Sequence, residues 1–285
     1  MKNSSRIFRS CLLAAIVVPG FAQAIVIRHD VPDAQYLALG AQFTGVGTII
    51  AGGSGGTGAL IAPNWVITAA HVVGNNTSAS FTLNGTVYNS NGVFTQAGWT
   101  LTNGMDVALV RLNQNVNGNP QIYSLFQGNP IGQTVYSVGF GATGTGLTGF
   151  THTDGNRRGM TNLIEAYWAG SNNTVFLSDF DSPAGNTSLF GTLFPTALEG
   201  QVAPGDSGGP AFFDVGGGNY QLAGIASFMF SQGQTNGMYG NGSGWHRVDA
   251  NMAWIHQTSG VPEPSTMILV GIGIAGLVAR RRARK

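Results

Sequence analysis

The body of this chain, residues 25–260, is a succession of short β-rich runs separated by glycine, asparagine and threonine. Short strands with turn residues between them are typical of β-barrels and β-sandwiches. Strands do not alternate with helical patterns, which argues against a doubly wound parallel sheet. The clearest runs are Gly47–Ala51, Trp65–Ala70, Val107–Leu112, Thr134–Gly139, Leu163–Trp168, Thr174–Leu177, Tyr220–Ser227 and Gly244–Val248. The pattern predicts an all-β fold and leaves the choice between barrels and a sandwich open.

One helix stands out near the end of this body, over residues 248–258. Val248, Met252 and Ile255 recur at helical spacing, and Asp249 stands where its side chain can cap the first turn. We expect this helix to pack onto the sheet that precedes it.

Charge is distributed unevenly along the sequence. Between residues 25 and 260, five arginines and eleven acidic residues give a net charge near −6, and there is no lysine. A body of this kind has no basic surface for nucleic acid. The single cysteine, Cys11, lies in the first segment, so the mature chain is expected to have no disulfide.

The first 24 residues have the pattern of a secretory signal peptide. Lys2, Arg6 and Arg9 form a basic start, residues 11–18 are apolar, and Ala22-Gln23-Ala24 fits the A-x-A cleavage pattern. The apolar run is too short to span a bilayer. We therefore expect export, with cleavage after Ala24 by signal peptidase.

Residues 259–285 have the pattern of a second targeting segment. Val261-Pro262-Glu263-Pro264-Ser265 ends the domain, residues 267–279 are apolar, and five of residues 280–285 are basic. A short apolar segment followed by basic residues is typical of a tail anchor. Pro-Glu-Pro, the apolar segment and the arginine cluster together resemble the PEP-CTERM sorting signal of Gram-negative bacteria. The resemblance implies a transmembrane helix as a transient inner-membrane anchor, recognition by an exosortase, and removal of the tail.

Three separated motifs place reactive side chains beside predicted strands. His71 follows the apolar run Trp65-Val66-Ile67, Asp106 begins another run, and Ser207 lies in Gly205-Asp206-Ser207-Gly208-Gly209-Pro210. Singly, a histidine at a strand end or an aspartate at a turn is ordinary loop composition. Together the three residue types are those that acyl transfer requires.

The chemistry explains why these types are needed together. A serine hydroxyl is too weakly acidic to attack a carbonyl alone, so a histidine must take its proton. An aspartate holds that histidine in the required tautomer and stabilises its imidazolium form. Backbone N–H groups must point at the developing oxyanion, and glycines beside the serine let the loop turn so that they converge.

In the order His, Asp, Ser, the segments Thr68–His71, Asp106–Leu112 and Gly205–Pro210 resemble the trypsin/chymotrypsin family of serine proteases. The resemblance implies two antiparallel six-stranded β-barrels, a cleft between them and a C-terminal helix. It places a protease domain over residues 25–258, with barrels over about 40–130 and 131–247.

The resemblance also implies roles for individual residues. His71 is then the general base, Asp106 its orienting partner and Ser207 the nucleophile. The backbone N–H groups of Gly205 and Ser207 form the oxyanion hole. The Ser227 side chain supports the aspartate, and its backbone pairs with substrate.

The specificity pocket is implied less sharply. Gln201 falls near its base, where no acid disposes it to bind Arg or Lys, and Met229 narrows its wall. We expect a small or medium neutral side chain to be preferred. Asp179 and Asp181 stand in an Asn/Gly-rich segment, but their spacing is not that of an EF-hand, so solvated turn carboxylates are the favoured interpretation. No metal or cofactor is expected.

Cleavage after Ala24 would expose Ile25 at a distance from His71 similar to that of the family's activated N-terminus. The resemblance then pairs the Ile25 ammonium with Asp206, so that no separate activating cut is needed. Against this, Ile27 and Arg28 stand where the family has glycines. An edge strand over residues 25–27 is the alternative, and the sequence leaves both open.

The expected function is that of an exported serine endopeptidase that hydrolyses protein or peptide substrates through an acyl-enzyme. The alternative is a catalytically silent protease-like module that binds polysaccharide or a matrix protein. An esterase with the same triad is a third hypothesis, although the chain order Ser, Asp, His of an α/β-hydrolase is not met. The expected location is the periplasm, cell envelope or extracellular matrix of a Gram-negative bacterium.

Overall fold

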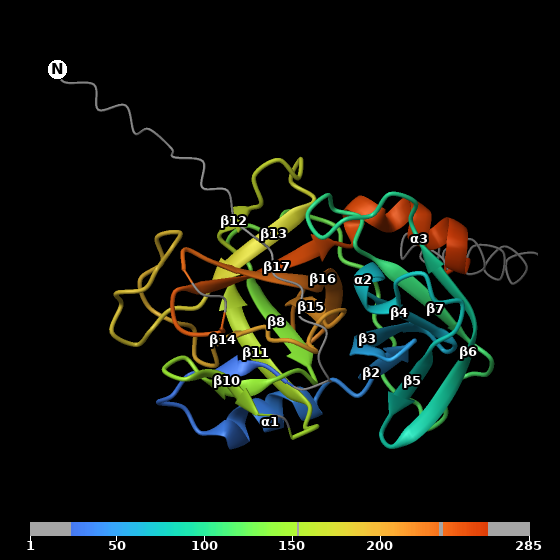
Figure 1. The fold of residues 1–285 in the computed structure, drawn as a ribbon, viewed down its shortest axis with the longest axis horizontal. Coiled ribbons are helices and arrows are strands. Elements are labelled where there is room, and N and C mark those ends of the chain that lie inside the picture. Colours follow the sequence, from blue (N-terminus) through green and yellow to red (C-terminus); the bar gives the residue numbers. More distant parts are fainter. Residues whose placement is uncertain (1–23, 153, 234–235, 262–285) are drawn as a thin grey trace, which may run out of the picture.

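The computed structural model describes residues 24–152, 154–233 and 236–261, and its strands form two halves that lie side by side (Figure 1). In the first half, six antiparallel strands close into a barrel in the order β2-β3-β4-β7-β6-β5. These strands are β2 (Val46–Ala51), β3 (Ser54–Ala62), β4 (Trp65–Thr68), β5 (Ser80–Leu83), β6 (Thr86–Thr95) and β7 (Ala108–Leu112). β4 is buried along its whole length, whereas β5 alternates in burial with the strand period of two.

The second half is built on a seven-stranded antiparallel sheet in the order β11-β8-β15-β16-β17-β13-β12. Its strands are β8 (Thr134–Gly139), β11 (Arg158–Leu163), β12 (Ala166–Tyr167), β13 (Val175–Asp179), β15 (Pro210–Asp214), β16 (Tyr220–Ser231) and β17 (Asn241–Arg247). The predicted all-β architecture with two β halves is confirmed.

The two halves differ in how they close. Six strands run from β11 to β13, as in a second barrel, but no β ladder joins β11 to β13 within the residues that the structure describes. Instead, the side chain of Asn162 on β11 donates to the carbonyls of Asp179 at 2.6 Å and Gly200 at 3.1 Å. A side-chain amide therefore links β11 to β13, which no backbone pairing joins in the described part of the chain.

A third sheet of four strands holds the start of the described chain. β1 (Val26–Ile27) lies between β9 (Thr143–Thr145), which is parallel to it, and β14 (Gly200–Gln201), which is antiparallel. β10 (Gly149–His152) pairs with β9. β1 is therefore an inner strand, and not the edge strand that the sequence left open.

Two helices lie near the N-terminal part of the domain. α1 (Asp33–Ala41), which the sequence analysis did not predict, packs closely on β11: a Cβ added to Gly40 would lie 2.6 Å from the Arg157 carbonyl oxygen. Only Tyr36, Leu39 and Gly40 of α1 are buried, so its apolar pattern is too sparse to read from sequence. α2 (Ala70–Val73) is a single turn directly after β4.

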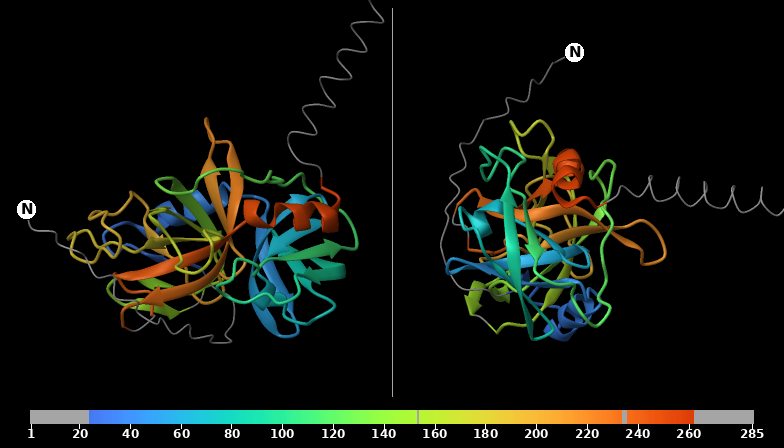
Figure 2. Two further views of the ribbon diagram at one scale, coloured as in Figure 1. Left: turned by 90° about the horizontal axis from the view of Figure 1, so that it is seen from above. Right: turned by 90° about the vertical axis from the view of Figure 1, so that its right-hand side faces the viewer.

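The C-terminal helix α3 (Met252–Ser259) follows a 3₁₀ turn, η1 (Asp249–Asn251), as the helical spacing predicted. Two details of that prediction were wrong. Asp249 caps no helical N–H, because its carboxylate pairs with Arg247 at 2.6 Å. The helix also packs against β7 of the first barrel, whereas we expected it to pack on the preceding sheet; Figure 2 shows α3 lying over the first half.

Aromatic side chains of the two halves meet at their boundary. Phe43 stacks on Phe212 of β15 with ring centroids 5.0 Å apart, and Tyr123 lies 4.4 Å from the same ring. Leu222 and Ile225 of β16 belong to the same buried cluster as the barrel residues. Buried aromatic contacts of this kind hold the halves in a fixed orientation, which any site built from both halves requires.

Candidate active site

His71 and Asp106 are joined by two hydrogen bonds. His71 is the second residue of the single turn α2, and Asp106 lies two residues before β7. The His71 N–H donates to Asp106 Oδ1 at 2.8 Å, and His71 Nδ1 lies 2.6 Å from Asp106 Oδ2. Because the carboxylate accepts, Nδ1 carries the proton and Nε2 is left as a base.

The Asp106 carboxylate is fully buried and still held in its charged form. Burial by itself would raise the pKa of Asp106, but the charge and hydrogen bond of His71 outweigh it and keep that pKa below its ordinary value. The Ser227 hydroxyl adds a further short hydrogen bond to Oδ2. Register shifts between Ala226 and Phe228, so Ser227 lies at a β-bulge of β16, a feature that re-aims a side chain.

The loop that carries Ser207 depends on glycines. Gly205 and Gly208 have φ angles of +95° and +81°, in the region that L residues rarely adopt. A Cβ added to Gly208 would lie 2.0 Å from Thr68 Oγ1. A side chain at that position would therefore displace the segment that leads to His71.

Backbone hydrogen bonds tie this loop to both halves of the molecule. The Thr57 N–H of β3 donates to the Ser207 carbonyl at 2.8 Å, and the Gly208 N–H donates to the Ala226 carbonyl of β16 at 2.8 Å. The Thr57 hydroxyl also donates to the Gly205 carbonyl at 3.1 Å. Sequence analysis missed Thr57, whose one signal is a hydroxyl inside a glycine-rich run that leads to a buried strand.

The loop that carries Ser207 and the turn that carries His71 lie close together. In the described part of the chain, the Ser207 hydroxyl makes no hydrogen bond to His71, and the N–H groups of Gly205 and Ser207 donate to no protein group. A Cβ added to Gly56 would lie 2.6 Å from the Ser207 carbonyl oxygen and 2.8 Å from Val72 Cγ2. The serine loop and the turn of His71 therefore meet at this glycine. Catalytic hydrogen bonds are often long without ligand and tighten when substrate binds.

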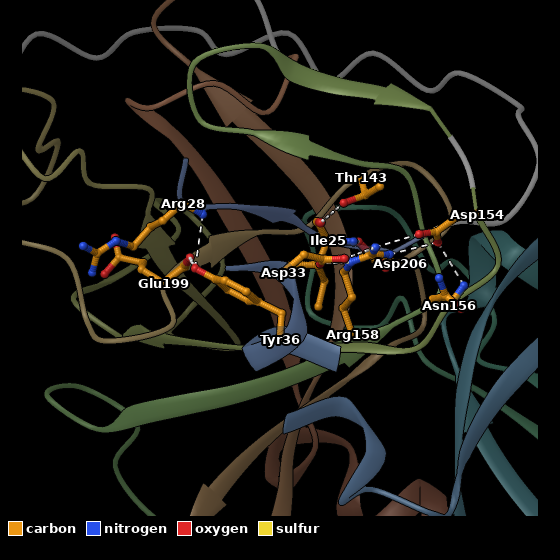
Figure 3. A network of polar contacts seen from close by, with 10 residues as sticks. All are labelled: Ile25, Arg28, Asp33, Tyr36, Thr143, Asp154, Asn156, Arg158, Glu199 and Asp206. Carbon is orange, nitrogen blue, oxygen red and sulfur yellow. Dashed lines mark hydrogen bonds and ion pairs between the residues drawn. The ribbon is translucent and has the colours of Figure 1, made fainter. Parts of the chain in front are cut away.

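The Asp206 carboxylate is buried next to Ile25 (Figure 3). Its Oδ2 accepts the N–H groups of Ile25 and Ala203, each at 2.8 Å, and Oδ1 accepts the Gly141 N–H at 2.7 Å. Burial raises the pKa of Asp206 to about 8, and the Ile25 hydrogen bond offsets only part of this rise. The predicted pairing of residues 25 and 206 is thus present as a contact of the backbone nitrogen.

The bulky residues after Ile25 are accommodated. Ile27 is buried among apolar side chains, and the Arg28 guanidinium turns away to pair with Asp30 at 2.7 Å. The Arg28 N–H donates to the Tyr36 hydroxyl at 3.2 Å, and that hydroxyl donates to the Glu199 carbonyl at 2.9 Å (Figure 3). The unpredicted helix α1 therefore supplies a partner where the family resemblance led us to expect glycine.

The predicted pocket residues lie on β14 and β16. Gln201 is fully buried, and its Nε2 donates to the Gly242 carbonyl at 2.8 Å. Met229 is half-buried on β16, opposite Ser243 of β17. Of the three, Ser227 alone contacts a residue of the predicted triad.

Asp179 and Asp181 are buried, so the interpretation as solvated turn carboxylates was wrong. They are 1% and 2% exposed. Asp179 accepts the Leu189 N–H, and Glu199 accepts the N–H groups of Asp181 and Thr196. Burial raises the pKa of Asp179 to about 8, of Asp181 to about 6 and of Glu199 to about 7. Among the described residues, no group of three His, Cys, Asp or Glu side chains is arranged to hold a metal ion.

The predicted signal peptide and the predicted C-terminal sorting segment lie largely outside the described residues. Residues 1–23 and the apolar segment 267–279 are not among them. Within residues 24–152, 154–233 and 236–261, no helix is long and apolar enough to cross a membrane.

Comparison with known proteins gives a match to the β-rich domain and a match to the C-terminal segment. The family model described as Trypsin matches residues 42–255, and the model described as PEP-CTERM protein-sorting motif matches residues 260–283. A solved structure of HL collagenase is similar, with a TM-score of 0.58 and 23% identity over 77% of this chain and 95% of that chain. Neuropsin, a serine protease expressed in mouse brain, is similar with a TM-score of 0.58 and 16% identity over 81% and 98% of the two chains. At these identities, the structural likeness establishes a shared fold.

Proposed function

Since the chain belongs to the trypsin family, we propose that it is an exported serine-type endopeptidase. In this proposal Ser207 attacks the scissile carbonyl while His71 takes its proton, and Asp106 stabilises the imidazolium that forms. The N–H groups of Gly205 and Ser207 bind the oxyanion. His71 then gives the proton to the leaving amine, and a water activated by His71 hydrolyses the acyl-enzyme.

The observation that supports this proposal most is the double contact between His71 and Asp106. A carboxylate that accepts both the backbone N–H and Nδ1 at 2.8 and 2.6 Å fixes the ring in one tautomer and one orientation. A purely structural histidine would need neither a buried carboxylate beside it nor a hydroxyl group, here that of Ser227, that donates to the carboxylate. The cost of burying the Asp106 carboxylate is understandable if an imidazolium forms beside it.

A fluorophosphonate probe tests the proposal, because it reacts only with activated serine hydroxyls. Residues 25–260 should be labelled, Ser207→Ala should not, and the matched control Ser231→Ala should be labelled as the unaltered protein is. Absence of labelling in a folded protein that begins at Ile25 would contradict the proposal and favour the silent binding module. Cleavage of short esters without cleavage of casein would favour an esterase.

We also propose that removal of residues 1–24 is itself the activating cut. The Ile25 nitrogen lies 2.8 Å from a buried Asp206 carboxylate that has no cationic partner among the described ion pairs. An ammonium at that nitrogen would supply the missing charge. Mass spectrometry of the exported protein should find Ile25 as the first residue; any other start contradicts this step.

The PEP-CTERM motif over residues 260–283 supports export by a Gram-negative bacterium and recognition of the tail by an exosortase. In this proposal the protease domain covers residues 25–258 and the tail is a transient inner-membrane anchor. Mass spectrometry of the C-terminal peptide tests it. A mature protein that keeps residues 280–285 would contradict removal of the tail.

A further inference from the structure

His246 is a second histidine in direct contact with Asp106, through the backbone N–H and not through the carboxylate. It lies on β17, is fully buried, and accepts the Asp106 N–H at its Nδ1 at 2.9 Å. Its Nε2 lies 2.8 Å from the Leu101 carbonyl oxygen. The proposed triad does not include this ring, and its place in the sequence suggested no role.

The two partners determine the protonation of the ring. A backbone N–H only donates, so Nδ1 of His246 is unprotonated; a backbone carbonyl only accepts, so Nε2 carries the hydrogen. A second proton would set Nδ1–H against the Asp106 N–H. Burial lowers the pKa of His246, and the charged groups that act on it are the Asp106 carboxylate and His71. The ring is therefore neutral in the pH range in which a histidine base is active.

The segment that His246 holds has no strand pairing of its own. Residues 99–107 lie outside the strands, and Asp106 follows this irregular stretch directly. His246 spans two backbone groups of the segment, at residues 101 and 106, and Asn251 holds a third through the Gly104 carbonyl at 2.8 Å. Asp106 is thus held at two places. His71 and Ser227 bind its carboxylate, and His246 accepts the hydrogen bond of its backbone N–H.

We propose that His246 is a positioning residue for Asp106: its neutral Nε2–H tautomer clamps the 101–106 segment, so that the Asp106 carboxylate meets His71 in one geometry. This inference rests on the proposed function, because it concerns the base of that reaction. A displacement of about 1 Å in a catalytic group can cost on the order of a hundredfold in rate. The ring touches neither substrate nor the reacting atoms, so its loss should lower kcat and leave KM unchanged.

Two amide variants separate the two nitrogens of the ring. In His246→Asn, Oδ1 stands near the place of Nδ1 and can still accept the Asp106 N–H, while the donor to Leu101 is lost. In His246→Gln, the amide nitrogen stands near Nε2 and can still donate to Leu101, while the acceptor for Asp106 is lost. Both variants remove the imidazole and bury an amide, so each controls for the other.

Steady-state kinetics with a peptide substrate, normalised by fluorophosphonate titration of active sites, give the first readout. We expect kcat within about threefold of the unaltered protein for His246→Asn and about ten- to a hundredfold lower for His246→Gln. In His246→Gln the acid limb of the kcat/KM profile should also move to lower pH, because a displaced carboxylate stabilises the imidazolium less. Equal kcat values and unshifted profiles for the two variants would overturn the proposal.

The second readout needs no turnover and so separates failure of this inference from failure of the proposed function. In the Ser207→Ala protein, ¹⁵N spectra of labelled histidines should give His246 as the neutral Nε2–H tautomer between pH 6 and 8. The low-field proton of His71 Nδ1 should persist in the His246→Asn background and be lost or shifted in His246→Gln. An Nδ1–H tautomer or an imidazolium at His246 would overturn the positioning role, whether or not the protein cleaves peptides.

Discussion

One residue in front of Ile25 should change how the stability of this protein depends on pH. We compare a protein of residues 25–260 with one of residues 24–260 whose Ala24 nitrogen is acetylated and therefore uncharged, both carrying Ser207→Ala to prevent self-digestion. In the longer protein the nitrogen beside Asp206 is an amide, as in the structure, where it lies 2.8 Å from Oδ2. In the shorter protein the same nitrogen is an ammonium. Ala24 is fully buried, so the added residue lies inside the protein.

The magnitude follows from the Asp206 carboxyl. Its pKa is raised by burial to about 8 in the folded chain that has the amide, against about 3.9 in an unfolded chain. The folded state then binds the proton more tightly, so stability is lost as pH rises from about 4 to about 8. Four pKa units at about 1.36 kcal/mol each amount to a loss on the order of 5 kcal/mol.

In the shorter protein the ammonium compensates the charge, and most of this loss should be absent. Pairing raises the pKa of the α-amino group of Ile25, whose unfolded value is about 7.7–8. Its contribution to stability is therefore fully present below that value and is lost only as pH rises through the higher folded value. The two proteins should differ most near pH 8.

Urea unfolding followed by tryptophan fluorescence at pH 5, 6, 7 and 8 measures the effect. The free energy of unfolding should fall by several kcal/mol across this range in the longer protein and by less than about 1 kcal/mol in the shorter one. In the Asp206→Asn background the longer protein should lose this fall in stability, because its titrating carboxyl is gone. Equal slopes for the two lengths with Asp206 intact would refute the reasoning.

Three further outcomes follow from single contacts. Asp106→Asn should lower kcat by on the order of 10⁴-fold while circular dichroism stays unchanged, because the amide favours the wrong tautomer of the base; a loss below tenfold would contradict the assigned role. Gly139→Ala should cost about 1–3 kcal/mol in urea unfolding, because the added Cβ would lie 2.0 Å from Asp206 Oδ1, whereas the control Gly233→Ala meets nothing within 4 Å. Arg158→Met should cost about 1.5–3 kcal/mol by the same assay, since this 4% exposed side chain pairs with two carboxylates at 2.6 Å; an unchanged unfolding midpoint would show that those pairs are not stabilising.

The elements that could be predicted from sequence are those with a local signal. The strand before His71 is an unbroken apolar run, and the helix after residue 248 has Met252 and Ile255 at helical spacing; both are present. Where several elements compete for one side chain, local pattern was misleading. Asp249 is a good cap by its position, yet Arg247 two residues earlier pairs with it.

Burial of polar groups was the least predictable property. Asp179 and Asp181 stand among Asn, Ser and Gly, the composition of a solvated loop, and only the folded chain shows that both are buried. Thr57 and His246 have no motif at all. Thr57 donates a hydrogen bond to a residue 148 positions away in the sequence, and His246 accepts one from a residue 140 positions away. No local pattern predicts contacts over such separations.

Sequence alone determined the family, the order of the three candidate catalytic residues and the C-terminal sorting motif, because each depends on short runs of consecutive residues whose chemistry is local. Tertiary structure alone decided which groups meet. It placed the Ile25 nitrogen against Asp206, clamped Asp106 between His71 and His246, and laid α3 on the first barrel. The physical reason is that a hydrogen bond or a buried charge depends on the partner that the fold brings within about 3 Å, and that partner can lie anywhere in the chain.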